Sequence, residues 1–259
     1  MSAPSSSQPH RLHGGGRIDR RRPLAFTHDG ARYEGYGGDT LASALLANGV
    51  HLVGRSFKYH RPRGIFAAGA EEPNALVQLG SGGLTEPNAR ATAVELYEGL
   101  CAASQNCWPS VRFDVWALND LLAPLFPAGF YYKTFMWPRS WWHSVYERVI
   151  RRAAGLGRAP VVPDPDRYEH MHAHCDVLVV GAGPAGLMAA LAAGRSGARV
   201  ILADEQTELG GALLAEPVDH PGAAWLRALA AELEACPELR VLTRTTAFGY
   251  YDHNYLALL

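Results

Sequence analysis

The chain has 259 residues, of which 48% are hydrophobic, and its formal net charge at pH 7 is −1. This composition is typical of a globular protein with a buried core, long enough for about two domains. It gives no support for a nucleic-acid partner, which usually requires a strongly basic face. No stretch approaches the roughly 18 uninterrupted apolar residues of a membrane-spanning helix, so no membrane partner is expected either.

The N-terminus and the cysteines bear on the cellular compartment. The polar start, MSAPSSSQPH, lacks the apolar core of a secretory signal, and residues 1–20 are expected to form a disordered arm. The four cysteines do not have the spacing of a disulfide framework. They are Cys101, Cys107, Cys175 and Cys236. We therefore expect reduced thiols and a cytoplasmic location.

Residues 21–105 predict a small α+β module. Leu24–Glu34 predicts two short strands around a turn at Asp29-Gly30. Asp39–Gly49 predicts a helix with a polar N-cap, an apolar stripe and a terminal glycine. Ala75–Leu79 predicts a further strand.

Residues 106–172 are expected to connect this module to a second domain. Aromatic side chains crowd Trp108–Trp142 and form either a contact surface for a partner subunit or part of an interdomain core. A helix is predicted over residues 139–154. Gly155–Asp166, with three prolines, is the best candidate linker.

Residues 173–259 predict an incomplete dinucleotide-binding domain of the α/β class. Alternating strands and helices are expected, with a buried first strand. Their predicted ranges are Asp176–Val180, Pro184–Ser196, Arg199–Ala203, Ala223–Ala235 and Arg240–Leu242. Phe248–Tyr255 is expected to form the first arm of a hairpin. A doubly wound domain needs two βαβαβ halves, and only about 85 residues follow Cys175. The chain is therefore expected to be a fragment, or the product of a frameshift or early stop.

A glycine-rich turn between the first strand and the first helix of this domain carries the strongest chemical signal. The sequence VLVVGAGPAG places three glycines, Gly181, Gly183 and Gly186, after an apolar strand and at the start of a helix. The first glycine permits the tight turn, the second lets the backbone approach a pyrophosphate, and the third allows close helix–strand packing. The helix N-terminus then faces the phosphates.

An acidic pair, Asp204-Glu205, ends the next strand at the spacing that this nucleotide motif requires. Asp204 has the register to bind the adenosine ribose, and its charge disfavours the extra phosphate of NADP. A loop containing Gly210-Gly211 follows. The predicted cofactor contacts are Gly181, Ala182, Gly183, Pro184, Ala185, Gly186, Asp204, Glu205, Gly210 and Gly211. These features do not distinguish NAD from FAD, and the alternative is a glycine-rich turn that binds nothing.

A cationic loop, Ser56–Gly64, is a second candidate binding element. Its charged members are Lys58, His60, Arg61 and Arg63. Because arginine forks suit phosphate, the loop could bind a flavin phosphate or face a partner subunit. The alternative is a surface loop held by local ion pairs with Glu71 and Glu72.

Two further arrangements give no site. Three alternating histidines precede a cysteine, but no recognised zinc spacing is present, so we predict no metal. These residues are His170, His172, His174 and Cys175. No nucleophile–base pair or carboxylate dyad stands out, and no catalytic residue is assigned.

Five segments of the chain together resemble the alpha subunits of heterotetrameric sarcosine oxidases, and the resemblance runs from about Arg22 to the C-terminus. The first of them resembles the helix of a ferredoxin-like module. The segments are Gly37–Gly49, Ser56–Gly69, Glu72–Asn74, Tyr131–Pro138 and Ala173–Gly186.

The resemblance implies a subunit of an enzyme that oxidatively demethylates sarcosine to glycine with O2, giving H2O2. It implies NAD in this chain, held by Gly181, Gly183, Gly186 and Asp204, with FAD as the alternative. It also implies FAD in a β subunit, a covalently attached FMN near the α–β boundary, and γ and δ subunits. Tetrahydrofolate would take up the one-carbon unit in a C-terminal region that this chain lacks.

The module departs from its iron–sulfur relatives in one respect. A plant-type 2Fe-2S cluster needs Cys-x4-Cys-x2-Cys and a distant fourth cysteine. His51–Gly64, where the first three would fall, contains no cysteine, and Cys101 and Cys107 have the wrong spacing. We therefore expect a cluster-free module, which favours sarcosine oxidase over an opine or hydroxyproline dehydrogenase. A non-catalytic scaffold that binds nucleotide only for structure is the third possibility, and the fragment alone is expected to be inactive.

Overall fold

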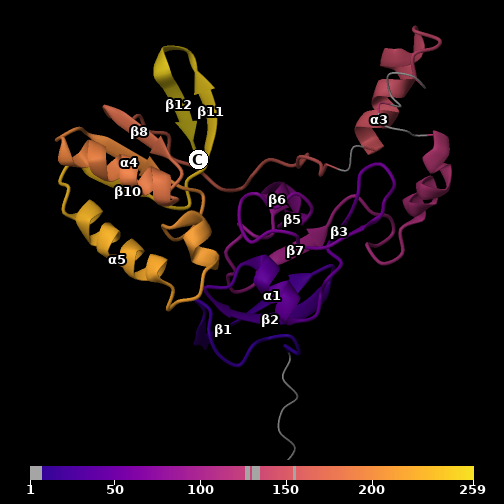
Figure 1. Cartoon of the computed structure of the whole chain (residues 1–259). Coiled ribbons are helices and arrows are strands. Elements are labelled where there is room, and N and C mark those ends of the chain that lie inside the picture. Colours follow the sequence, from indigo (N-terminus) through magenta and orange to yellow (C-terminus); the bar gives the residue numbers. More distant parts are fainter. Residues whose placement is uncertain (1–7, 126–128, 130–134, 154–155) are drawn as a thin grey trace, which may run out of the picture. The chain divides into compact units, whose positions relative to one another are not determined.

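The computed structural model describes residues 8–125, 129, 135–153 and 156–259, which form two compact units (Figure 1). Unit 1 comprises Met1–Arg11 and Ile18–Arg167, and unit 2 comprises Leu12–Arg17 and Tyr168–Leu259. Parts of four predicted segments lie outside the described residues. These are residues 1–7 of the predicted arm, part of the aromatic segment including Tyr131, the predicted helix end at Ala154 and the start of the linker at Gly155.

Unit 1 is built around a five-stranded sheet in the order β2-β1-β7-β5-β6. Strands β1 and β7 are parallel, and the other neighbours are antiparallel. The strands are β1 (Asp19–His28), β2 (Ala31–Gly37), β5 (Leu76–Leu79), β6 (Glu86–Arg90) and β7 (Cys101–Ser104), with a separate pair β3 (Gly54–Arg55) and β4 (Pro62–Arg63). The helical elements are α1 (Leu41–Ala47), two 3-10 helices (Gly82–Leu84 and Val115–Leu125), a π-helical turn (Trp142–Tyr146) and α3 (Glu147–Ala153).

Local sequence explains the first hairpin and the helix that follows it. Asp29 (φ 50°) and Gly30 (φ 77°) form the turn between β1 and β2, as predicted, because both central residues of such a turn need positive φ. Thr40 and Ser43 cap α1 reciprocally in a capping box. The apolar stripe of α1 packs on the sheet in the core of unit 1.

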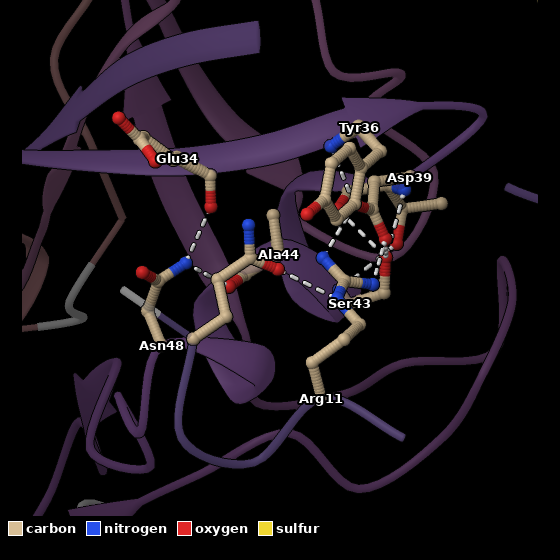
Figure 2. A network of polar contacts seen from close by, with 9 residues as sticks. Arg11, Glu34, Tyr36, Asp39, Ser43, Ala44 and Asn48 are labelled. Carbon is tan, nitrogen blue, oxygen red and sulfur yellow. Dashed lines mark hydrogen bonds and ion pairs between the residues drawn. The ribbon is translucent and has the colours of Figure 1, made fainter. Parts of the chain in front are cut away.

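Residues 8–20, the described part of the arm predicted to be disordered over residues 1–20, make ordered contacts that differ from that prediction. The guanidinium of Arg11 donates two hydrogen bonds, of 2.8 and 2.6 Å, to the carboxylate of Asp39, which is 2% exposed (Figure 2). Asp39 also accepts from the Tyr36 backbone N–H and the Ser43 hydroxyl. Strand β1 then begins at Asp19. A buried carboxylate strongly favours a paired cation, and this long-range pair is invisible in the local composition.

Unit 2 contains a three-stranded parallel sheet in the order β10-β9-β8. Its elements follow the predicted alternation of strands and helices closely. They are β8 (Val177–Val180), α4 (Pro184–Arg195), β9 (Val200–Ala203), a 3-10 helix (Gly211–Ala215), α5 (Pro221–Glu234) and β10 (Leu239–Leu242). Helices α4 and α5 pack together with alternate residues of β9, so both cover the same face of the sheet (Figure 1).

The first strand and the C-terminal hairpin differ from the prediction. All of β9 is buried because it is central, whereas β8 is an edge strand and Val180 is 55% exposed. The hairpin is complete, with β11 (Ala247–Tyr251) and β12 (Tyr255–Leu258) joined through a 3-10 turn (Asp252–Asn254). In the part of the chain that the structure describes, no helix has both the length and the apolar character to cross a membrane.

Candidate functional site

The glycine turn joins β8 to α4, and the fold itself requires two of its three glycines. Gly181 has a φ of +97°, a conformation that favours glycine. A Cβ at Gly186 would lie 1.9 Å from the carbonyl oxygen of Gly181, so any side chain there would collide with the backbone of the turn. These two positions match the roles predicted from the sequence.

Gly183 is different, because nothing in the described part of the chain explains why this residue is glycine. A Cβ at this position would meet no atom within 4 Å, and its φ of −71° and ψ of 177° suit any residue. Gly183 is also the N-cap of α4, and no described side chain caps the helix there. Open space at a helix N-terminus with uncapped amides is an arrangement that suits a phosphate group.

Asp204 is tied directly to the glycine turn. Its Oδ2 accepts a 2.5 Å hydrogen bond from the backbone N–H of Ala182, and its Oδ1 accepts one of 2.7 Å from that of Gln206. An ionised carboxylate has about four acceptor positions, so both oxygens retain capacity for ribose hydroxyls. Glu205 lies beside it, partly exposed.

The Gly210-Gly211 loop also reaches the turn. The backbone N–H of Gly210 donates to the carbonyl of Ala182 at 2.9 Å. A Cβ at Gly211 would lie 2.8 Å from the Cα of Gly183, so the two backbones approach closely. The predicted residues of the turn, the end of β9 and this loop therefore lie together at the carboxyl ends of β8 and β9.

Arg17 is a residue at this end of the sheet that sequence reasoning missed. Its Nε donates a 3.1 Å hydrogen bond to Oε2 of Glu208, and its Nη2 contacts the same oxygen. Glu208 stands only two residues before Gly210. The two partners are 191 positions apart in the chain, so no local pattern could have paired them.

In the cationic loop of unit 1, His60 points inward. Its Nδ1 lies 2.6 Å from Oδ2 of Asp114, and both residues are buried. The same aspartate accepts the backbone N–H groups of Trp108 and Trp116. This imidazole joins two segments of unit 1 and is not available to a phosphate.

The other members of the loop do not converge on one point. Arg61 donates to Oδ1 of Asp120 at 2.8 Å, and Arg61 and Lys58 lie over the Tyr59 ring, at 4.7 and 4.8 Å from its centroid. Arg63 donates weakly to the carbonyl of Pro62. Arg63 also lines a cavity of about 370 Å³ with, among others, Arg55, Phe57, Asn74 and Asn106.

Glu72 does not form the ion pair considered for this loop. Its carboxylate accepts four backbone N–H groups instead, those of Phe66, Ala67, Asn74 and Ala75. Burial alone would raise its pKa, but the four donors outweigh burial and the pKa is lowered. His60 and Arg61 pair instead with Asp114 and Asp120, from a distant part of the sequence.

The histidines before β8 are exposed. His170, His172 and His174 lie in an extended stretch with no regular structure. Within the described ranges, no three His, Cys, Asp or Glu residues are grouped so that they could hold a metal ion.

Two family models match separate parts of the chain. Residues 21–107 match the family model described as a 2Fe-2S iron-sulfur cluster binding domain. Residues 176–244 match the model described as an FAD dependent oxidoreductase. The glycine turn, Asp204 and the Gly210-Gly211 loop all fall in the second match.

Comparisons with whole proteins give long alignments. The chain is 62% identical, over 95% of its length, to the sarcosine oxidase subunit alpha of Rhizobium meliloti (strain 1021). It is 40% identical, over 96% of its length, to the subunit of the same name from Corynebacterium sp. (strain U-96). The chain spans 25% and 22% of the length of these relatives.

One solved structure supports the mixed α/β fold. The crystal structure of L-proline dehydrogenase from P. horikoshii superimposes with a TM-score of 0.51, covering 93% of this chain and 37% of that one. The sequence identity is 18%, so this likeness concerns the fold alone.

Proposed function

We propose that this chain, which is related by sequence to a part of the sarcosine oxidase alpha subunits, supplies the nucleotide-binding portion of such a subunit. The observation that carries the proposal is Gly183, whose missing side chain the protein's own packing does not require. A bound pyrophosphate explains that glycine, since the phosphates would occupy the place of a Cβ.

The proposed ligand is NAD. The uncapped amides of α4 face its phosphates, helped by the positive end of the helix dipole. Asp204 binds the adenosine ribose while remaining hydrogen-bonded to Ala182. Glu205 and the Gly210-Gly211 loop form the rest of the proposed site. FAD is the alternative, because both dinucleotides share an ADP half and the second family model is named for FAD.

The proposed reaction is the oxidative demethylation of sarcosine to glycine by a heterotetramer. Oxygen is reduced to H2O2, and the one-carbon unit passes to tetrahydrofolate. In this proposal the amine is oxidised at FAD of a β subunit, and FMN near the α–β boundary passes electrons to oxygen. The γ and δ subunits and the folate-binding region lie outside this chain, and a cytoplasmic location stays a prediction.

We also propose that the ferredoxin-like module holds no cluster. The sequence has four cysteines, and only Cys101 and Cys107 fall in the matched residues 21–107. In the structure, the loop where cluster ligands are expected is held by protein contacts. His60 bonds Asp114, and the Arg55 guanidinium donates to the carbonyls of His60, Val111 and Arg112.

Calorimetric titration of the purified chain with NAD, and separately with FAD, tests nucleotide binding. We expect NAD to bind, and Gly183→Ala to weaken it by about 1.4 kcal/mol or more, a tenfold rise in Kd. The thermal midpoint of this variant should match the wild type, since the new Cβ meets no atom. Retention of FAD in preference to NAD would select the alternative ligand, and binding of neither would contradict the proposal.

The substrate is tested with a full-length subunit co-expressed with its partners. Turnover of sarcosine, measured as H2O2, is expected to exceed turnover of hydroxyproline or an opine, and the reverse ranking would indicate another amine dehydrogenase. In that complex, Gly183→Ala should lower turnover while assembly persists. Loss of assembly instead would indicate a non-catalytic scaffold.

A further inference from the structure

The N-terminal segment Leu12–Arg17 belongs to unit 2, although about 150 residues separate it from the rest of that unit in the sequence. Its last residue, Arg17, reaches the loop that leads from Asp204 to the Gly210-Gly211 pair. Arg17 contacts Glu208 through Nε and Nη2. Gly210 bonds Ala182 of the glycine turn, and two residues span at most about 7 Å, so the backbone of Glu208, the partner of Arg17, lies within that distance of Gly210.

The acidic residues after β9 would repel an anionic ligand, and a nearby cation would offset that repulsion. Asp204, Glu205 and Glu208 follow β9 within five positions, and a dinucleotide pyrophosphate adds two negative charges. The cations of α4 and the start of β9 are committed elsewhere, Arg195 to Glu232 and Arg199 to Asp176. Arg244, whose N–H bonds the carbonyl of Gln206, is a second cation near this loop.

The guanidinium of Arg17 can serve Glu208 and a ligand together. It has five N–H donors in a planar fork, and Glu208 engages its Nε and Nη2. Its side chain is 34% exposed, so it is reachable from solvent. Gly14, Gly15 and Gly16 precede it, and a chain of glycines lets the arginine shift toward a phosphate at little steric cost.

We propose that Arg17 is a phosphate-binding residue of the dinucleotide site, supplied by the N-terminal segment and positioned by Glu208. This inference rests on the proposed function, because it assigns a contact to the same nucleotide. It adds a residue from outside the β8-α4-β9 unit.

The test compares NAD with adenosine, which lacks phosphate, by calorimetric titration of the wild type and Arg17→Ala. We expect the Kd for NAD to rise about tenfold in the variant, the value of one charge-assisted hydrogen bond, and the Kd for adenosine to stay unchanged. Arg195→Ala is the matched control. It removes an arginine from another ion pair of unit 2 and should bind NAD like the wild type.

A second readout is cleavage after Arg17 by trypsin. NAD should slow this cleavage in the wild-type chain, and adenosine should not. An equal rise in the Kd values for NAD and adenosine in Arg17→Ala would overturn the inference. The segment would then stabilise the whole binding site and would not contact the phosphates. Wild-type affinity for NAD in Arg17→Ala would overturn it while leaving the proposed function intact. A wild-type chain that binds no nucleotide would overturn both.

Discussion

Each unit has one segment that the sequence predicts as a candidate binding element, the cationic loop Ser56–Gly64 of unit 1 and the glycine turn of unit 2, and the polar groups in and beside these two segments are used in opposite ways. In unit 1 the charged side chains bond other parts of the protein. His60 is buried against Asp114, and Arg55 donates to three carbonyls. In unit 2 the turn leaves space beside Gly183 and uncapped amides at α4.

The difference shows that a cluster of charged residues is weak evidence for a binding site. A glycine that neither packing nor backbone conformation requires is stronger evidence. The cationic loop attracts attention in the sequence, but its most buried member holds the fold together. Gly183 carries no charge, yet the packing of the described residues does not explain why it is glycine. Three predictions test this contrast, from the largest expected effect to the smallest.

Asp114→Ala should destabilise unit 1 by about 4 kcal/mol, because it leaves the buried His60 imidazole without its acceptor and also removes the acceptor of the partly buried Trp108 N–H. Asp120→Ala is the matched control. It removes the partner of Arg61 in an exposed pair and should cost less than about 1 kcal/mol. Urea denaturation of both variants measures the difference. Similar small decreases in the free energy of unfolding of both variants would mean that the buried His60–Asp114 contact does not stabilise the loop.

Gly186→Ala should destabilise unit 2 by about 3 kcal/mol, since its Cβ would lie 1.9 Å from the Gly181 carbonyl oxygen. Gly183→Ala, in the same turn, should change stability by less than about 0.5 kcal/mol. Differential scanning calorimetry without nucleotide compares the two variants. Equal destabilisation would show that Gly183 has a packing role, and the argument for a ligand there would fail.

The stability of unit 1 should fall at acid pH through Glu72. The pKa of this carboxylate is lowered in the folded state, because four backbone N–H donors outweigh the effect of burial. The folded state therefore gains stability from the ionised group above its ordinary pKa of 4.5, and loses it as the pH falls through the lowered folded value. Glu72→Gln should show a flatter stability profile between pH 5 and the acid limit, as followed by urea denaturation. An unchanged slope would contradict this role.

The sequence by itself determined the elements whose cause is local. The strand–turn–helix of unit 2, the Asp29-Gly30 turn and the capped helix α1 all follow from residue patterns within about ten positions. The roles of Gly181 and Gly186 were predictable for the same reason, since each depends on the backbone of the turn itself.

Only the tertiary structure decided which distant residues meet. Arg11 with Asp39, His60 with Asp114 and Arg17 with Glu208 are 28, 54 and 191 positions apart. Tertiary structure also made β8 an edge strand and β9 a central one, which apolar content alone could not tell apart. Pairing between side chains that are distant in sequence depends on how the chain folds back on itself. Local sequence periodicity does not predict those contacts.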